Sequence, residues 1–291
     1  MEVYDFALAG EAKRDFLVEI ENDKNKVVAE KFNGFREMWY LRDEGNEMLT
    51  RSGSSHIHAV PQFHQIIEML DKTVIDCEGM SPQGNSSKYA KSIFGSGADH
   101  AIEVQRQYGN AYLVAFDILS YCGKDVRDLP FAERRDYLID AIASLYNHGI
   151  EDIISEKLVH ENKAAYYDEI VGRGGEGVIV KDLRAPYIAG SRDSWIKVKK
   201  VVTRDYYIVG FTSGNGKYAD AIGAILYGIK NDTGGFDILG RSSGMTDVVR
   251  WDMARNKDRY IGKLAEFGGK DINENTGVLI HPTFIRIRED I

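Results

Sequence analysis

The chain has 291 residues, of which 43% are hydrophobic and 28% are charged, and its net charge is −8. This composition is typical of a globular protein with a core of its own, in one large domain or two ordinary ones. No apolar run approaches the roughly 20 residues that a membrane span requires, and the charged N-terminal region predicts no signal peptide. Two cysteines, Cys77 and Cys122, are too few for a disulfide framework or a four-thiolate metal site, so we expect a cytoplasmic protein.

The charge is distributed unevenly along the chain. Between residues 181 and 204 there are seven basic and two acidic side chains, so the remainder of the chain is strongly acidic. A basic segment on an acidic protein can bind a polyanion, because counterion release depends on the contact face and not on the total charge. It can equally be a solvated charged segment, and the charge alone favours that simpler interpretation.

The first two hundred residues alternate between short strand-like and helical patterns. Runs rich in valine, isoleucine and aromatic residues are bounded by glycine, asparagine or aspartate, as strands are. Apolar residues three and four positions apart predict helices over 61–70 and 131–146. This mixture indicates an α+β first domain. The predicted strands cover 26–30, 37–41, 73–77, 111–116, 177–181 and 195–198.

The pattern changes after residue 200. Short strands are predicted over 205–211, 221–229 and 235–239, separated by glycine-rich turns, with one helix over 246–256. Several short strands in fewer than a hundred residues are typical of a small β-barrel. We therefore place a domain boundary between residues 202 and 203.

Three local patterns favour ordinary structure over chemistry. The glycine-rich segment 172–177 is followed by a predicted strand, whereas a dinucleotide-binding loop is followed by a helix, so a turn is favoured. His56, His58 and His64 lack a fourth metal ligand at a known spacing. Cys122 lies beside a predicted turn and is assigned no role.

Seven short motifs follow one another in a fixed order along the chain. They run Glu30-Lys-Phe-Asn-Gly-Phe-Arg36, Thr50-Arg-Ser-Gly53, Val74-Ile-Asp-Cys-Glu-Gly79, Val114-Ala-Phe-Asp-Ile-Leu119, Glu176-Gly-Val-Ile-Val-Lys181, Trp195-Ile-Lys-Val-Lys199 and His281-Pro-Thr-Phe-Ile-Arg-Ile-Arg-Glu-Asp290. Each motif alone is weak evidence. Together they resemble the motifs of the covalent nucleotidyltransferases, most closely those of ATP-dependent DNA ligases of small phage or viral type.

This resemblance implies that Lys31 attacks the α-phosphate of ATP and becomes a lysyl-adenylate. A free lysine amine is almost entirely protonated at neutral pH, so we expect nearby cations to favour its neutral form. The resemblance gives phosphate contacts to Lys197 and Lys199, which alternate on one predicted strand and so share a face. It gives Glu176 a role in metal binding and Glu78 a contact with the ribose, and both carboxylates suit Mg²⁺.

Further contacts with the nucleotide and with DNA are implied for five basic residues. Arg36 and Arg51 match family arginines that bind the ribose region and the 5′-phosphate of the nick, where a planar guanidinium suits phosphate oxygens. Lys181, Arg192 and Lys200 of the basic segment are expected to contact the nucleic acid. Asp76 is expected to serve as a structural partner.

The expected adenine pocket departs from the family pattern. The family places an aromatic ring four residues before the aspartate of the motif at 114–119, and here that position is Leu113, beside Tyr112. Either Leu113 covers one face of the base or the strand is shifted. Val178 and Ile179 are the candidates for the other face.

The final motif brings the barrel into the reaction. The resemblance implies that Arg286, Arg288 and Asp290 orient the pyrophosphate, which requires the barrel to close over ATP and then to open for DNA. Two positions depart from the family pattern. Asn33 stands where an aspartate is usual and keeps hydrogen bonding without the charge, and Ile291 stands where a lysine is usual.

The sequence therefore predicts an α+β fold with a nucleotidyltransferase (adenylation) domain over 1–202 and an OB-fold barrel over 203–291. The predicted activity is ATP-dependent sealing of nicks in duplex DNA by a monomer that uses ATP and Mg²⁺, in the host cytoplasm if the protein is phage-encoded. The segment 212–219 is too short for the hairpin with which some viral ligases enclose DNA. We therefore expect the basic segment to bind DNA in a salt-dependent way.

Two other classes of protein share part of this pattern. An RNA ligase or an mRNA-capping guanylyltransferase has the same Lys-x-x-Gly and later lysine motif, but the Pro-x-Phe-x-Arg-x-Arg-Glu-Asp ending favours a DNA ligase. A non-catalytic OB-type binding protein is disfavoured, because the chain keeps Lys31, Glu176, Lys197 and Lys199 together.

Overall fold

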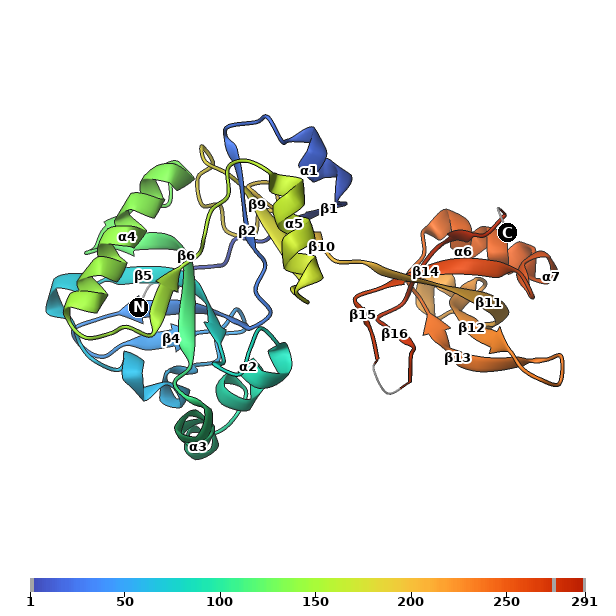
Figure 1. Ribbon diagram of the computed structural model, residues 1–291, viewed down its shortest axis with the longest axis horizontal. Coiled ribbons are helices and arrows are strands. Elements are labelled where there is room, and N and C mark those ends of the chain that lie inside the picture. Colours follow the sequence, from blue (N-terminus) through green and yellow to red (C-terminus); the bar gives the residue numbers. More distant parts are fainter. Residues whose placement is uncertain (1–2, 274–275, 290–291) are drawn as a thin grey trace. The chain divides into compact units, whose positions relative to one another are not determined.

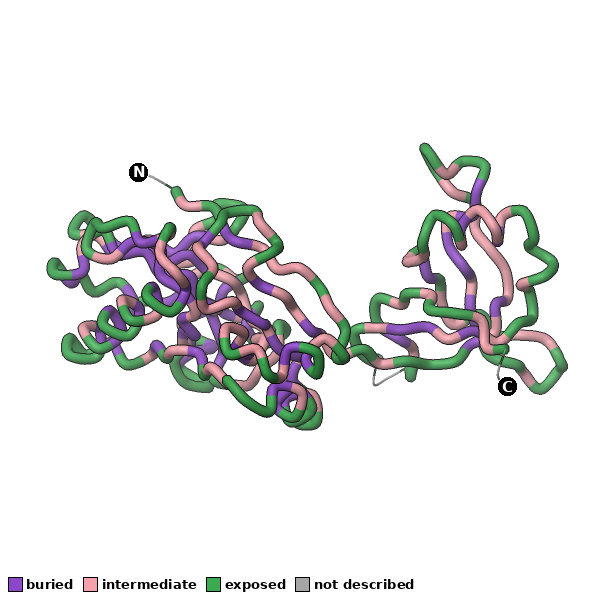
Figure 2. Tube along the Cα trace, turned by 90° about the horizontal axis from the view of Figure 1, so that it is seen from above, coloured by how far each residue is buried: buried purple, intermediate pink, exposed green. Residues whose placement is uncertain are grey.

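The computed structural model describes residues 3–273 and 276–289. The chain divides into two compact units, Met1–Lys199 and Lys200–Ile291, whose elements are drawn in Figure 1. This division lies three residues before the predicted boundary, because strand β10 (Trp195–Lys199) ends there and strand β11 (Val202–Ser213) begins the second unit. Each unit has its own buried core, visible as separate buried segments in Figure 2.

Two sheets form the framework of the first unit. The smaller sheet has the order β1-β10-β9-β2, and the larger has the order β4-β3-β5-β6-β7, with β8 parallel to β6. The strands of the smaller sheet are β1 (Gly10–Ala12), β10, β9 (Gly177–Asp182) and β2 (Lys26–Glu30). Those of the larger sheet are β3 (Phe35–Leu41), β4 (Glu47–Leu49), β5 (Thr73–Met80), β6 (Tyr112–Tyr121), β7 (Lys124–Asp125) and β8 (Ile153–Ser155).

Helices cover one face of each sheet (Figure 1). Helix α4 (Phe131–Asn147) packs along β6 through its apolar face, while α2 (Ser87–Phe94) and α3 (Ala98–Tyr108) complete the core of the larger sheet. Helices α1 (Asp15–Glu19) and α5 (Lys163–Gly172) pack against each other and cover the smaller sheet. The faces without helices therefore remain for a site between the two sheets.

The structure confirms the six predicted strands and the helix at 131–146, but the predicted helix at 61–70 is wrong. Only single turns form there, η2 (Pro61–Phe63) and η3 (Glu68–Leu70), following η1 (Ile57–Ala59). Ile67 between them is extended, with φ −125° and ψ 93°. Phe63 and Leu70 lie in separate turns, and both are fully buried. Because they are seven residues apart, their spacing is the same as that of residues on one face of a helix.

The second unit is a curved antiparallel sheet in the order β13-β12-β11-β14-β17. Aromatic rings from three adjacent strands, Tyr206, Tyr227 and Phe267, stack in its core. The predicted helix is present as α6 (Asp247–Arg255), capped by Thr246, which accepts the N–H of Val249. The remaining elements are β12 (Ile222–Lys230), β13 (Phe236–Ser242), β14 (Leu264–Gly269), β15 (Asp271–Ile272), β16 (Leu279–Ile280), β17 (Thr283–Ile287), η4 (Gly216–Tyr218) and α7 (Lys257–Tyr260).

Two expectations from the sequence concern single segments. The connection between β11 and β12 is short and contains only the turn η4, so no long hairpin stands at that position. None of the helices in the described ranges is long and apolar enough to cross a membrane.

Candidate active site

A cavity in the first unit brings together five of the predicted site residues, which are Lys31, Arg36, Glu78, Lys181 and Lys197. Both sheets contribute to it, the smaller through β2, β9 and β10 and the larger through β3, β5 and β6. Its lining consists of Ala9, Glu30, Lys31, Phe32, Arg36, Glu78, Phe116, Glu156, Ile179, Lys181, Trp195 and Lys197. The cavity thus lies between the helix-free faces of the two sheets.

Lys31 follows directly after β2 and reaches into this cavity. Its backbone N–H donates to the carbonyl of Gly177 at 2.9 Å, which continues the pairing of β2 with β9. Its Nζ donates to Oε2 of Glu176 at 2.8 Å, and the two side chains are 23% and 11% exposed. The amine is therefore held in one place and remains accessible from the cavity.

Gly34 explains why the nucleophile motif needs a glycine three residues after the lysine. A Cβ at this position would lie 2.3 Å from the carbonyl oxygen of Gly79, so no larger residue fits. The close approach lets the N–H of Gly34 donate to Oε1 of Glu78 at 2.9 Å. Burial raises the pKa of the Glu78 carboxyl to about 7, against the opposing charge of Lys31.

Arg36 lines the cavity, but its guanidinium is already engaged by protein groups. It forms a two-point ion pair with the fully buried Asp76, at 3.0 and 2.6 Å, and donates to the carbonyl of Ala7 at 2.6 Å. The rings of Phe116 and Trp195 lie 5.5 and 5.1 Å away. Asp76 is therefore a structural partner of Arg36. The contacts use three of the five N–H groups of the guanidinium, and the side chain still lines the cavity.

The predicted walls of the base pocket need correction. Leu113 is fully buried in the core of the larger sheet, and Val178 is fully buried in the core of the smaller one, so neither lines the cavity. Ile179 lines it instead of Val178, because neighbouring residues of a strand point to opposite faces.

Phe116 lines the cavity, whereas Leu113 does not, and a β-bulge lies at this point of β6. Asp117 pairs with Asp76 and Ala115 pairs with Cys77, so Phe116 is the extra residue between two consecutive pairs. Phe116 follows Ala115, which is buried in the helix-covered core, and so faces the opposite side of β6, where its ring meets Trp195 edge-on at 5.7 Å.

Lys181 is also placed differently from its predicted contact with DNA. Its side chain is 2% exposed and forms an ion pair with Glu156, which is 4% exposed, while Nζ donates to the carbonyl of Phe116 at 3.0 Å. Burial raises the pKa of the Glu156 carboxyl against the attraction of Lys181. The pair closes the inner end of the cavity, and a nucleic acid cannot reach it from solvent.

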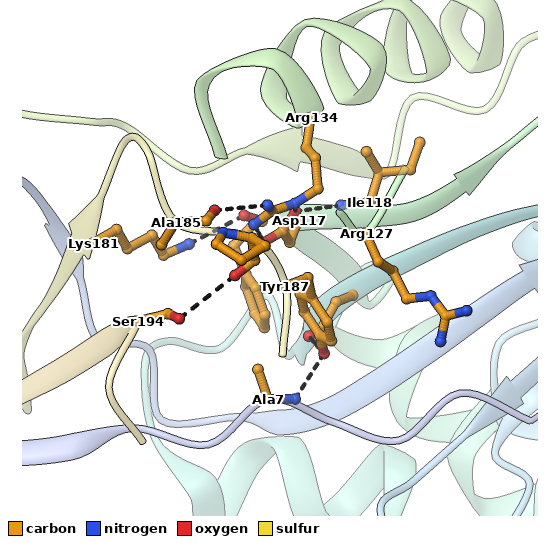
Figure 3. A network of polar contacts seen from close by, with 12 residues as sticks. Ala7, Asp117, Ile118, Arg127, Arg134, Lys181, Ala185, Tyr187 and Ser194 are labelled. Atoms are coloured by element: carbon orange, nitrogen blue, oxygen red, sulfur yellow. Dashed lines mark hydrogen bonds and ion pairs between the residues drawn. The ribbon is translucent and has the colours of Figure 1, made fainter. Parts of the chain in front are cut away.

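A buried polar network fixes the segment between β9 and β10 beside this pair (Figure 3). Arg134 forms a two-point ion pair with Asp117, at 2.8 and 2.7 Å, and donates to the carbonyl of Ala185 at 2.9 Å. Further along, the hydroxyl of Tyr187 accepts the N–H of Ala7 at 2.9 Å and donates to the carboxylate that pairs with Arg36. These contacts determine where β10 begins and hence where its lysines lie.

Lys197 and Lys199 lie on the same face of β10, as predicted. Lys197 lines the cavity, and its Nζ is 3.3 Å from the exposed carboxylate of Glu11. Lys199 is paired with Gly177 across the sheet at the end of the strand and does not line the cavity. One of the two lysines is therefore positioned for a ligand in the cavity as it stands.

The remaining predicted site residues lie outside the cavity. Arg51 is exposed in the turn after β4, and Arg192 is exposed just before β10. In the second unit, Lys200 lies 3.9 Å from Asp271, Arg286 lies 2.8 Å from Glu266, and Arg288 lies 2.8 Å from Asp205. Asp290 lies outside the described residues.

Glu78 and Glu176 were predicted to bind a metal. Glu176 accepts a hydrogen bond from Nζ of Lys31 at 2.8 Å, and Glu78 accepts one from the N–H of Gly34 at 2.9 Å. Both carboxylates therefore lie beside the Lys31 segment. Over 3–273 and 276–289, no group of three or more His, Cys, Asp or Glu side chains is arranged to hold a metal ion. His56 donates to or accepts from Glu37 at 2.6 Å and is not part of a histidine cluster.

Comparison with known proteins gives a consistent result. A family model described as the ATP dependent DNA ligase domain matches residues 8–199. A probable DNA ligase of Kineococcus radiotolerans is 28% identical over 247 residues, which cover 81% of this chain and 46% of that protein. A probable DNA ligase of Dictyoglomus turgidum is 27% identical over 228 residues, which cover 71% of this chain and 38% of that protein.

Two solved structures share the fold over almost the whole chain. One, from a structure–function analysis of Lig E DNA ligases, has a TM-score of 0.68 at 19% identity and covers 99% of this chain and 100% of that one. The other, the ATP-dependent DNA ligase from bacteriophage T7 in complex with ATP, has a TM-score of 0.57 at 15% identity and covers 98% of each. They confirm the predicted fold, a nucleotidyltransferase unit followed by an OB-fold sheet.

The chain spans less than half the length of these curated relatives. The matched segment nevertheless contains Lys31, the whole cavity and every strand of the first unit. Since the family model matches well over half of the sequence, this chain belongs to the family of ATP-dependent DNA ligase domains.

Proposed function

We propose that this chain is an ATP-dependent polynucleotide ligase that seals nicks between 5′-phosphate and 3′-hydroxyl ends in duplex DNA. The observation that carries the proposal is the position of Lys31, whose amine is held by Glu176 at the wall of a cavity that Lys197 also lines. A nucleophilic amine, a carboxylate and a further cation are what transfer of a nucleotidyl group to an enzyme requires.

The reaction has three steps. Nζ of Lys31 attacks the α-phosphate of ATP and loses a proton, for which Glu176 at 2.8 Å is the neighbouring acceptor, while the bond to the leaving pyrophosphate breaks. A 5′-phosphate oxygen at the nick then takes the AMP and breaks the phosphorus–nitrogen bond. Finally the 3′-hydroxyl attacks that 5′-phosphate, a phosphodiester forms, and AMP leaves.

The cavity offers apolar walls for the base and charged groups for the phosphate. Phe116 and Ile179 provide a ring face and an aliphatic side chain, and the buried pair of Lys181 and Glu156 ends the cavity with a donor and an acceptor. Aromatic and aliphatic walls around a few fixed polar groups are typical of sites for nucleobases. Lys197 supports the α-phosphate from the neighbouring strand.

The residues present fit a magnesium ion shared with the nucleotide. Mg²⁺ commonly takes one or two protein carboxylates and completes its shell with water and substrate phosphates, so a full cage of protein ligands is not required. Glu176 and Glu78 would hold it. When bound, it would supply charge that neutralises the phosphates and favours the neutral amine of Lys31.

For the nick itself we propose a separate set of exposed cations. Arg51, Arg192 and Lys200 are accessible or partly accessible, and a guanidinium or ammonium group can pair with backbone phosphates. Lys181 no longer belongs to this set, because its amine is buried against Glu156.

The test follows Lys31 directly. The protein should retain label from α-labelled ATP and Mg²⁺ in an alkali-stable, acid-labile form, as expected for a phosphoramidate bond to an amine. Lys31→Ala should abolish the label and the sealing of an unadenylated nick. Lys157→Ala, which removes a lysine outside the cavity lining, is the matched control and should keep both. Label from GTP in place of ATP, or sealing of nicked RNA in place of nicked DNA, would reject the proposal.

A further inference from the structure

One amide side chain spans the position of Lys31. Oδ1 of Asn85 accepts the backbone N–H of Asn33 at 2.8 Å, and Nδ2 of Asn85 donates to Oε1 of Glu30 at 3.0 Å. These partners stand one residue before Lys31 and two residues after it. The amide orientation is unambiguous, because an N–H can only donate and an ionised carboxylate can only accept.

Asn85 is itself held by structure that is remote in sequence from Lys31. It lies between a short turn closed by Ser81 and Gly84 and the start of helix α2. The N–H of Ser86 donates to the carbonyl of Gly84 at 2.9 Å, and the Ser86 hydroxyl caps α2. The amide of Asn85 therefore projects from a fixed helix start.

The other contacts around Lys31 each fix a single residue. The N–H of Lys31 is held by Gly177, and the N–H of Gly34 is held by Glu78. The second carboxylate oxygen of Glu30 pairs with Arg173 at the surface. Among these contacts, Asn85 is the one that joins the chain before the lysine to the chain after it.

We propose that Asn85 is a positioning residue for Lys31, one that sets the direction of its amine for attack on the α-phosphate. The inference rests on the proposed lysyl-adenylate chemistry and adds a requirement to it. Asn85 acts through the backbone and through Glu30, so it affects the steps in which Lys31 forms or breaks a bond. Closure of a nick that already carries AMP does not use Lys31 as nucleophile and should not depend on Asn85.

The test compares two substitutions at Asn85 with one at a matched site. Asn85→Asp keeps the size and one acceptor but loses the donor and places a second carboxylate against Glu30, while Asn85→Ala removes both contacts. Asn110→Asp is the control, because Asn110 likewise donates to a carboxylate, that of Asp152 at 2.8 Å, on the surface of the same unit.

In single-turnover labelling from ATP, both Asn85 variants should transfer AMP to Lys31 about tenfold to a hundredfold more slowly, as expected for a misdirected nucleophile. The half-saturating ATP concentration should stay within about twofold, because Asn85 itself does not line the cavity. Closure of an AMP-capped nick should proceed at the wild-type rate in both variants, which also shows that they are folded. Asn110→Asp should match the wild type in both assays.

A double substitution provides the sharper readout. In Glu30→Gln with Asn85→Asp, the amide and the carboxylate exchange places, so that a donor again faces an acceptor. The new carboxylate at position 85 can still accept the N–H of Asn33. Labelling should therefore recover relative to Asn85→Asp alone. A structural role limited to the start of α2 predicts no such recovery.

Three results would overturn the inference. They are unchanged labelling in both Asn85 variants, equal loss in labelling and in closure of AMP-capped nicks, or no recovery in the double variant. Failure of the wild-type protein to take label from ATP would instead reject the proposed function, and with it the chemistry on which this inference rests.

Discussion

Two lysine–glutamate pairs lie at the same cavity and differ in exposure and in surroundings. Lys31, Lys181 and Glu156 line the cavity, and Glu176 contacts it through the amine of Lys31. Lys31 and Glu176 lie at the end of β2 and the start of β9, where both side chains remain partly open. Lys181 and Glu156 lie at the inner end and are almost fully buried. The same two residue types therefore occupy a partly exposed position, where we propose the nucleophile, and a buried one.

The surroundings of each lysine explain the difference. Nζ of Lys181 lies 4.5, 4.8 and 5.1 Å from the ring centres of Trp195, Phe131 and Phe116, and its side chain is 2% exposed. In the part of the chain that the structure describes, no aromatic ring forms such a contact with the amine of Lys31. A lysine becomes available as a nucleophile through access as much as through its neighbours.

The first prediction tests this comparison through stability. Lys181→Met leaves Glu156 buried without its partner and should cost about 3–5 kcal/mol of unfolding free energy. Lys31→Met breaks a partly exposed pair and should cost no more than about 1 kcal/mol. Urea unfolding of the two variants at neutral pH measures the contrast.

Removal of both partners of the buried pair is the control. Lys181→Met with Glu156→Leu should recover most of the stability, because an apolar pair of similar size avoids the unpaired charge. Similar small losses in Lys181→Met and Lys31→Met would show that the inner end of the cavity is hydrated, and the comparison would fail.

Lys31 and Glu176 could be singled out from the sequence through the family resemblance, but the ion pair between them was not predicted. The Lys-x-x-Gly segment and the glutamate before β9 are fixed by motif order, and the alternation of β10 correctly placed Lys197 and Lys199 on one face. Gly34 follows the same logic, since its close contact with Gly79 is required by the strand pairing around the nucleophile.

The structural pair could not be predicted, because its role depends on residues far apart in the sequence. The burial of Lys181 follows from the packing of Trp195 and Phe131 around it, and no local pattern indicates that packing. Phe116 lines the cavity although the family spacing indicates Leu113, because the spacing alone does not show which face of β6 each residue occupies. Arg36 forms an ion pair with Asp76, forty residues away, and its motif position alone does not indicate that partner.

The second prediction extends the comparison to cations of the second unit. We propose that Arg286, Arg288 and Asp290 orient the pyrophosphate in the first step. Arg288→Ala should then slow labelling of Lys31 from ATP by about a hundredfold, the usual cost of losing one donor to a developing charge. Closure of an AMP-capped nick should stay within about threefold, since no pyrophosphate leaves in that step.

Arg255→Ala removes another arginine of the same unit, an exposed one in the last turn of α6, and should change neither rate. Equal loss of labelling and closure in Arg288→Ala would show that the second unit mainly holds DNA. The separation of its role from that of the cavity would then be abandoned.

The third prediction concerns Glu78, a carboxyl of the cavity that faces Lys31 without forming an ion pair with it. Its pKa is raised to about 7 from the ordinary 4.5. Between pH 4.5 and pH 7 the folded protein therefore keeps this carboxyl protonated, while the unfolded chain has released the proton. The contribution of Glu78 to stability is therefore fully present below pH 4.5 and is lost as the pH rises through 7. The loss amounts to at most about 3 kcal/mol.

Chemical unfolding of the wild type and Glu78→Gln across this range isolates the effect. The stability of the wild type relative to the variant should decline as the pH rises, whereas a constant difference would contradict the raised pKa. In a Lys31→Met background the decline should continue to a higher pH, because loss of the opposing charge raises the pKa of the folded state further.

The last prediction has the smallest expected effect and concerns DNA binding, to which accessible cations should contribute and buried ones should not. Arg192→Ala and Lys200→Ala should each reduce the slope of log affinity against log salt by about 0.9, the value for one lost phosphate contact on duplex DNA. When the salt is raised from about 50 to 200 mM, the fall in affinity for a nicked duplex differs between variant and wild type by only about threefold per residue. The slope is therefore the better measurement. The double variant Lys181→Met/Glu156→Leu should leave the slope unchanged, since the Lys181 amine does not reach the surface. A reduced slope in that double variant would show that the inner lysine contacts DNA after all, and the distinction between the two pairs would no longer hold.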